Sequence, residues 1–248
     1  MLPHINITLP SFSVFAFIGG FFALLLVYSR REKFGVKPFD LLKLVILCAI
    51  GAFLGAKALF ILTRIPWLVT NFSAGNLIFL IMRSGIVYYG GLFGALLAVK
   101  IFAKFCRYDE TATYRMVVPA IPLFHGFGRI GCFLAGCCFG SALDAPFVFY
   151  ALRLRRIPVQ AFEAVFCFVV FILLIIIEKK RHEWDLLKIY LLSYAVFRFC
   201  IEFFRGDNLR GIFLLSTSQW ISLAIVVYYA IRWFRNRRRA ESMEGENP

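Results

Sequence analysis

Long apolar segments constrain this chain more than any other feature. A run of about 20 apolar residues crosses the hydrocarbon core of a bilayer as a helix. The sequence contains seven such runs, near residues 12–28, 41–63, 85–103, 116–137, 159–177, 186–204 and 213–234. The chain is 61% hydrophobic and only 17% charged, which leaves too little polar surface to coat a soluble globule. We therefore predict an all-α polytopic membrane protein with seven transmembrane helices.

The regions outside these runs have their own signatures. The first run follows a short uncharged N-terminus without the basic residues or cleavage pattern of a signal peptide, so we expect it to be retained as a span. The stretch from Pro66 to Met82 is apolar but interrupted by asparagine and glycine, which favours an interfacial arm over an eighth span. Residues 1–239 then form a single transmembrane domain, and residues 240–248 a disordered polar tail on the cytoplasmic side.

Basic residues predict the orientation of the chain. Most of them lie in four clusters, which fall on one side of the membrane if seven spans alternate: residues 30–43, 100–115, 179–188 and 232–239. Because Lys and Arg accumulate in cytoplasmic loops, we predict an N-terminus outside the cell and a cytoplasmic C-terminus. The net charge of +14 then reflects topology and attraction to anionic lipid rather than nucleic-acid binding.

Four charged residues lie in or beside the apolar runs: Arg129, Glu163, Arg198 and Glu202. A charge at the bilayer centre costs about 2.5–3.5 kcal/mol, so such residues indicate function by default. The predicted topology brings them to one depth, just below the outer surface, as a single polar cavity. Two guanidinium groups from different helices can clamp the phosphodiester of a phospholipid headgroup. The alternative is that each arginine only neutralises a glutamate, and the spacing of Arg198 and Glu202 allows them to pair.

Glycines accumulate in two of the predicted spans. Gly90 and Gly91 allow close approach by a lipid glycerol, and helix packing is the alternative explanation. Gly126, Gly128 and Gly131 surround Arg129. We expect them to weaken that helix and to free backbone N–H groups for an anion.

Cysteines raise the question of a metal site. Cys132, Cys137 and Cys138 are close in sequence, with His125 nearby. Thiolates and imidazole are zinc ligands, but this spacing matches no closed zinc module, so we predict no metal. Oxidation of the adjacent pair Cys137 and Cys138 and ordinary packing both stay open. The other four cysteines are expected to pack as small hydrophobes.

Four motifs together resemble those of one enzyme family. The segment 125–140 reads His-Gly-Phe-Gly-Arg-Ile-Gly-Cys-Phe-Leu-Ala-Gly-Cys-Cys-Phe-Gly and resembles the Gly-Arg-hydrophobic-Gly-Asn-Phe core of prolipoprotein diacylglyceryl transferases. The segment 194–205 is similar to the family's Tyr-x-x-x-Arg-x-x-x-Glu-Phe helix. Residues 157–163 resemble its Pro-Ser-Gln-x-Tyr-Glu element, and residues 89–92 its His-Gly-Gly-Leu. The resemblance covers nearly the whole chain.

The resemblance implies a specific reaction for the domain 1–239. The diacylglyceryl group of phosphatidylglycerol is transferred to the lipobox cysteine of an exported prolipoprotein, and a thioether and glycerol phosphate form. No cofactor is expected, and the implied location is the bacterial plasma membrane, crossed several times. A free thiol has a pKa of about 8.5, so forming the attacking thiolate needs a base or a positive field.

The same resemblance implies roles for particular residues. The two arginines would stabilise leaving-group charge, while Glu163 or Glu202 would orient groups or accept the thiol proton. The implied catalytic residues are Arg129, Arg198, Glu202, Tyr89 and Tyr194. The implied substrate-binding residues are Gly90, Gly91, Gly128, Gly131, Cys132, Gly140, Gln160, Glu163 and Lys57.

Several positions depart from the family's pattern. Tyr89 stands in place of a histidine, which replaces a base of pKa about 6.5 by a phenol of pKa about 10. Cys132 stands in place of an asparagine and Cys137 in place of a glutamate. Phe12 replaces a tyrosine of the first span, and Lys57 an arginine of the second. The resemblance is therefore to a divergent member.

Two other functions stay open because of these departures. One is a family-like protein that binds phospholipid headgroups, with another acceptor or without transferase activity. The other is an anion carrier or channel, although the chain lacks the paired broken helices typical of such transporters. The loop 141–157, with Arg153, Arg155 and Arg156, is expected either to gate lipid access or to bind headgroups.

Overall fold

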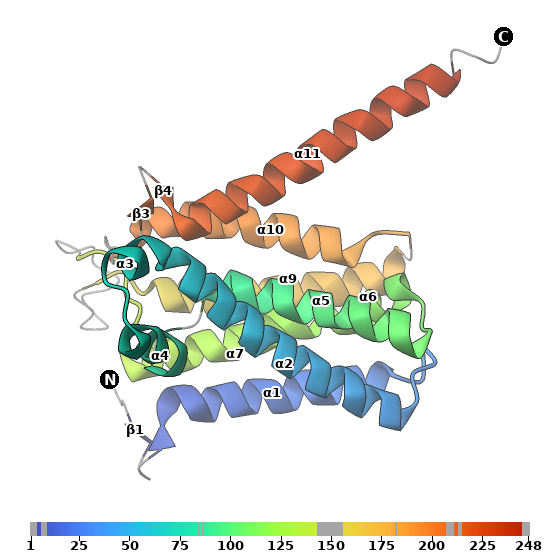
Figure 1. Cartoon of the computed structure of the whole chain (residues 1–248). Helices are drawn as coiled ribbons and strands as arrows, with labels where there is room; N and C mark the ends of the chain where they lie inside the picture. Colours follow the sequence, from blue (N-terminus) through green and yellow to red (C-terminus); the bar gives the residue numbers. More distant parts are fainter. Residues whose placement is uncertain are drawn as a thin grey trace.

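Long helices make up most of the chain in the computed structural model (Figure 1). The structure describes residues 4–5, 9–83, 85, 87–142, 156–181, 183–206, 211–212 and 215–244. Within these residues, five helical stretches are long and apolar enough to cross a membrane. They are α1 (Ser11–Arg30), α2 (Pro38–Thr63), α5 (Tyr88–Cys106), the stretch formed by α6 (Glu110–Val117) and α7 (Ala120–Ala135), and α9 (Val159–Lys180). These helices agree with the first five predicted spans.

Two further helices coincide with the last two predicted spans. α10 (Leu186–Ile201) has 16 residues and continues into the short 3-10 helix η1 (Glu202–Phe204). α11 (Thr217–Glu244) has 28 residues, and its second half is rich in arginine. Neither has both the length and the composition of a span, so the total of seven stays a prediction. α11 also continues to Glu244, into the tail predicted to be disordered, because Ala, Glu and Met there are good helix formers.

The predicted interfacial arm forms two short helices, α3 (Ile65–Thr70) and α4 (Ala74–Arg83). With 6 and 10 residues, both are too short to cross a bilayer. Figure 1 places them at one end of the helix bundle. Two small antiparallel hairpins lie at the same end, formed by β1 (His4–Ile5) with β2 (Leu9–Pro10) and by β3 (Gly211–Ile212) with β4 (Leu215–Ser216).

Local sequence signals explain where several helices begin and end. Pro38 opens α2, a position at which its missing N–H has no helical partner to lose. Asp185 caps α10 by accepting a hydrogen bond from the backbone N–H of Lys188 at 3.1 Å. Gly136 adopts a φ of 72° and ends α7 in the left-handed conformation that glycine tolerates.

Glycines bring α2 and α5 into close contact. Gly51 and Gly55 of α2 lie against Gly94 and Gly90 of α5, and a Cβ atom added at any of these positions would overlap the facing backbone. Small residues allow the backbones of membrane helices to approach in this way. This contact places the start of α5, with its two tyrosines, beside α2.

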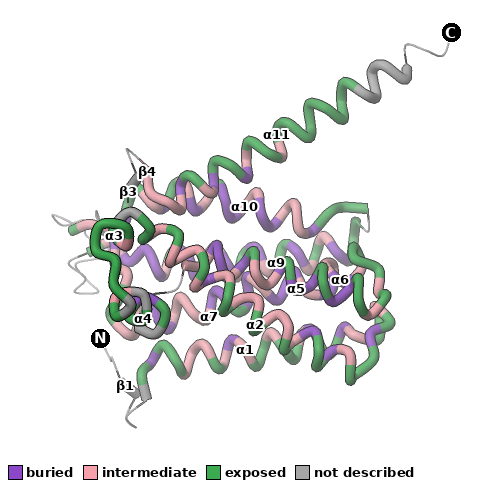
Figure 2. Tube along the Cα trace, viewed as in Figure 1, coloured by how far each residue is buried: buried purple, intermediate pink, exposed green. Residues whose placement is uncertain are grey.

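Large apolar side chains cover the outside of the bundle. Phe17 of α1, Phe53 of α2 and Phe105 of α5 are 77%, 60% and 80% exposed. Figure 2 shows exposed positions recurring along α1, α2 and α11. An apolar surface of this extent is expected where helices face lipid.

The two ends of the bundle differ in their connections. The turns that join α1 to α2, α5 to α6 and α9 to α10 all lie at the end opposite α3 and α4 (Figure 1). At that end Glu178 Oε2 lies 2.5 Å from Arg30 Nη2, and its Oε1 lies 2.9 Å from Lys33 Nζ. Arg30 also donates to the carbonyl oxygen of Arg115 at 2.7 Å. These contacts join α1, α6 and α9 on the predicted cytoplasmic side.

Candidate active site

Glu163 of α9 lies at the centre of the polar residues inside the bundle, and it is only 1% exposed. Arg129 of α7 contacts it at two points: Nη2 donates to Oε1 at 3.0 Å, and Nε lies 3.0 Å from Oε2. Tyr194 of α10 donates its hydroxyl to Oε1 at 3.1 Å. One carboxylate therefore joins α7, α9 and α10.

Arg198 of α10 brings a second guanidinium group to the same carboxylate. Its Nη1 lies 3.7 Å from Glu163 Oε2, and its Nη2 lies 2.6 Å from Glu202 Oε2. Arg205 extends this network, with Nε 3.8 Å from Glu202 Oε2. The predicted pairing of Arg198 with Glu202 is confirmed, and Arg129 and Arg198 converge on Glu163.

This network carries an excess of positive charge. It contains the guanidinium groups of Arg129, Arg198 and Arg205 and the carboxylates of Glu163 and Glu202, which is three positive charges against two negative ones. In the described part of the chain, Nη1 of Arg198 is buried without a hydrogen-bond acceptor. A buried donor without an acceptor is costly, and an anionic oxygen would satisfy both the donor and the charge.

His125 and Tyr88 also belong to this site, although the sequence did not indicate either as catalytic. The Nε atom of Arg129 donates to His125 Nε2 at 3.3 Å. The ring of Tyr88 stacks on the imidazole with the centroids 3.9 Å apart, and its hydroxyl lies 2.5 Å from that of Tyr190. The four-residue spacing of His125 and Arg129 on one helix is a signal that could have indicated the first contact. Tyr88 is on a different helix, α5, so spacing along the sequence gives no indication of its contact with His125.

Tyr89 lies nearby but faces another partner. Its hydroxyl is 2.6 Å from Ser222 Oγ of α11, and its ring centroid is 5.6 Å from that of Tyr194. It is 2% exposed. The hydroxyl that stands in place of the family's imidazole is therefore engaged with α11, whereas the preceding residue, Tyr88, faces His125.

The glycines predicted to bind substrate have different surroundings. Gly90 packs against the backbone of Gly55, and Gly91 lies near the carbonyl oxygen of Ala52, so both serve the contact of α5 with α2. Gly131 packs against the Cα atom of Phe12 on α1.

Gly128 and Gly140 complete this group. Nothing lies within 4 Å of a Cβ built at Gly128, so its side of α7 is open. Gly140 lies against the carbonyl group of Phe204 and the side chain of Ile157. Its backbone also forms an antiparallel β-bridge with Arg205. α7 runs unbroken through 126–131, so the prediction that these glycines free backbone N–H groups is wrong. Helical hydrogen bonding overrides the weak helix propensity of glycine here.

Gln160 and Lys57 complete the residues predicted to bind substrate. Gln160 is fully buried and donates from Nε2 to the carbonyl oxygen of Cys137, while its Oε1 atom accepts no hydrogen bond from the described residues. Lys57 is half-buried in α2. In the loop predicted either to gate lipid access or to bind headgroups, Arg156 forms an antiparallel β-bridge with Ala142. Residues 143–155, including Arg153 and Arg155, lie outside the described residues.

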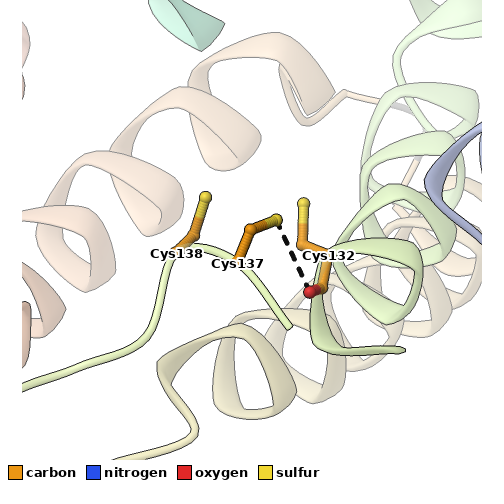
Figure 3. A group of neighbouring side chains, drawn as sticks. All are labelled: Cys132, Cys137 and Cys138. Atoms are coloured by element: carbon orange, nitrogen blue, oxygen red, sulfur yellow. Dashed lines mark hydrogen bonds between the residues drawn. The ribbon is translucent and has the colours of Figure 1, made fainter. Parts of the chain in front are cut away.

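Cys132, Cys137 and Cys138 come together at the end of α7 (Figure 3). Their sulfur atoms all lie within 4.8 Å of one another. Gly136 and Cys138 both have left-handed backbones, with φ of 72° and 62°, and this double turn folds the chain back toward Cys132. Spacing along the sequence did not predict this convergence, because it depends on two consecutive changes of backbone direction.

The electrostatic surroundings of Cys138 favour its thiolate. A hydrogen bond from the Cys132 thiol, with further attraction from Arg129 and Arg205, lowers the pKa of Cys138 below its usual range despite partial burial.

These features define a class of protein: a helical membrane protein with a buried, positively charged site between three helices. Comparison with known proteins narrows this class. A model of the family described as prolipoprotein diacylglyceryl transferase matches residues 1–235. The chain belongs to the prolipoprotein diacylglyceryl transferase family.

Individual relatives agree with this assignment. The chain is 32% identical to the phosphatidylglycerol–prolipoprotein diacylglyceryl transferase of Clostridium tetani over 213 residues, which cover 83% of this chain and 84% of the relative. It is 32% identical over 232 residues to the enzyme named transferase 2 of Clostridium perfringens, covering 90% of each chain. The transferase of Campylobacter lari is 32% identical over 213 residues, with 79% and 77% covered.

Proposed function

We propose that this protein transfers the diacylglyceryl group of phosphatidylglycerol to the lipobox cysteine of prolipoproteins. The observation that carries this proposal is the convergence of Arg129 and Arg198 on the buried Glu163, with one Arg198 donor left without an acceptor. The names of the relatives supply the substrates, and the excess positive charge of the network suits a phospholipid phosphate.

The reaction requires charge to be stabilised on the leaving group. The acceptor thiol loses its proton to water, its sulfur attacks the glycerol carbon that carries the phosphate, the C–O bond breaks, and the electron pair leaves with glycerol phosphate. Arg198 binds the departing phosphate through Nη1, and Glu163 holds Arg129 and Arg198 in position for it. In a site with little water, removal of one such donor slows a reaction by about 100- to 1,000-fold.

The remaining polar residues support these arginines. Tyr194 fixes Glu163 through its hydroxyl, and Glu202 pairs with Arg198 and Arg205. Gly128 lies on the same helix face as the exposed Phe124, so the open space at this glycine is on the outside of α7 and we assign no role to it.

The proposed membrane arrangement has seven spans, with α10 and the first part of α11 as the last two. The N-terminus lies outside, the C-terminus lies in the cytoplasm, and the membrane is the bacterial plasma membrane. The basic turns at one end of the bundle support this orientation (Figure 1). Glu163 near the start of α9 and Arg198 near the end of α10 then lie close to the outer surface, where exported precursors arrive.

A direct assay tests this function. Purified protein is incubated with phosphatidylglycerol and a lipobox peptide, and the thioether product is detected by its mass. Arg198→Ala and Arg129→Ala should slow product formation by about 100-fold or more, and a peptide with serine in place of cysteine should yield none. Product from both arginine variants at the wild-type rate would exclude the assigned roles.

One observation favours a second function. Because the Tyr89 hydroxyl contacts Ser222 rather than the Glu163 network, it does not replace the family's histidine as a base in the same position. A protein that binds phosphatidylglycerol and uses a different acceptor is therefore the second candidate. Lipid binding without product in the assay above would support it.

A further inference from the structure

The sulfur atoms of Cys132, Cys137 and Cys138 have the arrangement of a metal-binding trio. All three lie within 4.8 Å of one another. Thiolate ligands bind zinc at about 2.3 Å, so two sulfurs of a tetrahedral site are about 3.8 Å apart. Side-chain rotations that shorten the sulfur–sulfur distances by up to about 1 Å therefore convert the cluster into one face of a tetrahedron.

The chain holds these sulfurs in place from several directions. Cys132 is fixed in α7, while the left-handed residues Gly136 and Cys138 turn the following segment back over it. Buried Gln160 of α9 donates to the Cys137 carbonyl, which secures the same segment from a second helix. A non-glycine residue with φ of 62° is uncommon and persists where its surroundings determine it.

Charge and access also suit a cation. A divalent ion with three thiolates carries one net negative charge, and Arg129, one helical turn before Cys132 on α7, supplies a positive charge nearby. Cys132 is buried, Cys138 is half-buried and Cys137 is exposed, so one side of the trio is open to an incoming ion. Among common metals, soft thiolates select zinc-like ions over magnesium or calcium.

We propose that Cys132, Cys137 and Cys138 bind a thiophilic divalent cation of the zinc class, whose fourth coordination position accepts the thiol of the acceptor cysteine. The first half of this proposal stands on the cluster alone, and the second half rests on the proposed transferase function. Three protein ligands with one open position are the arrangement of reactive rather than structural zinc sites.

The position of the trio connects it to the transfer reaction. Cys132 lies one helical turn after Arg129, so an ion held there is close to one of the two arginines of the proposed transfer site. A thiol that coordinates such an ion is deprotonated. The acceptor S–H bond breaks with its proton passing to water, the sulfur then attacks the glycerol carbon, and the C–O electron pair leaves with the phosphate. This supplies an acceptor thiolate without the histidine that Tyr89 replaces.

Metal binding is tested first without reference to activity. The full-length protein is purified in detergent, reduced, freed of metal and titrated with Zn²⁺ and with Co²⁺. We expect one ion per chain and a thiolate-to-cobalt absorption band. Serine at position 132, 137 or 138 should weaken binding by more than about 100-fold, because loss of an outer-shell partner alone already costs 10- to 100-fold. The matched control is Cys200→Ser, an exposed cysteine of α10.

A second variant distinguishes loss of a metal ligand from misfolding of the protein. Cys138→His, which returns a ligating side chain, should recover cobalt binding. The proposal is overturned if the wild type binds no ion, if serine variants bind as well as the wild type, or if the reduced thiols form a disulfide in preference to binding Zn²⁺.

The use of the open position is tested separately. Addition of a lipobox peptide should change the visible spectrum of the cobalt protein, and the serine peptide should not. Removal of metal should lower thioether formation while phosphatidylglycerol binding is retained. Undiminished transfer by metal-free protein would overturn the role of the ion and leave the transferase function intact. Metal binding and a peptide-dependent spectrum without any transfer would support the site and overturn the transferase function instead.

Discussion

At the scale of single residues, Glu163 determines how two arginines coexist in an apolar interior. Arg129 and Arg198 come from different helices, and without a shared anion their charges would repel at a depth where water does not screen them. Glu163 contacts both, but the network still has one more positive charge than negative. The carboxylate therefore positions the guanidinium groups while leaving them able to bind an anion.

Replacing Glu163 by glutamine tests this role. Glu163→Gln keeps the size of the side chain but removes the charge that both arginines contact, and we expect transfer to fall by about 100-fold or more. The melting temperature should also fall, since removing one partner of a buried ion pair costs about 3–5 kcal/mol. Glu110→Gln, at an exposed position of α6, is the matched control and should change neither measurement. Wild-type transfer by Glu163→Gln would contradict the positioning role.

We expect loss of the hydroxyl group to have different effects at Tyr194 and at Tyr89. Tyr194→Phe removes the hydrogen bond to Glu163 and should slow transfer by about tenfold, which corresponds to about 1.4 kcal/mol in the barrier. Tyr89→Phe removes only the contact with Ser222 and should cost about 0.5–1.5 kcal/mol of stability with transfer retained. Initial rates and thermal melts of both variants check this. Equal losses of activity would show that Tyr89 also acts in the reaction.

At the scale of helices, the close contact of α2 with α5 positions Tyr88 and Tyr89 at the start of α5. Gly55 and Gly90 face each other across this contact, so neither side can accept a methyl group without separating the backbones. The site thus depends on packing between helices that contribute neither arginine nor glutamate to it.

A methyl group at Gly55 tests this dependence. Gly55→Ala should destabilise the protein by about 1–3 kcal/mol through overpacking, and transfer should fall as Tyr88 moves from His125. Gly20→Ala on α1 is the control, because its added Cβ meets Phe124 only at 3.9 Å, an ordinary contact. Thermal melts in detergent compare the two. If Gly55→Ala melts at or above the temperature of Gly20→Ala, the α2–α5 contact is not tight in the membrane protein.

The sequence predicts the spans and the depth of the charged residues well, because both depend only on helix length and helix direction. Apolar runs predicted five described spans, and alternating direction predicted that Arg129, Glu163 and Arg198 would share one depth. The rest depends on how each helix is rotated about its axis and on single backbone angles. That is why the stacking of Tyr88 on His125 and the approach of three cysteines became visible only in the structure.

At the scale of the whole molecule, charge is distributed along the bundle axis. Basic turns and a buried cluster around Glu178 occupy one end, and the short helices α3 and α4 with the β-hairpins occupy the other (Figure 1). The Glu163 network lies toward the second end, since it involves the start of α9 and the end of α10. An orientation with the basic end in the cytoplasm gives exported precursors access to the site.

Protease accessibility tests this orientation. A cleavage site inserted beside the exposed Phe72, in the turn between α3 and α4, should be cut in intact spheroplasts, because this turn is predicted to lie outside. A site inserted beside Lys33, in the turn between α1 and α2, and a tag after Pro248 should be cut only in inverted vesicles, since basic loops remain in the cytoplasm. Retained transfer activity shows that each insertion leaves the fold intact.

Cleavage of the turn near Phe72 only in inverted vesicles would reverse the topology, and it would place the Glu163 network on the cytoplasmic side, away from exported cysteines. A C-terminal tag exposed in spheroplasts would instead show that α11 does not return the chain to the cytoplasm, so that the number of spans is even.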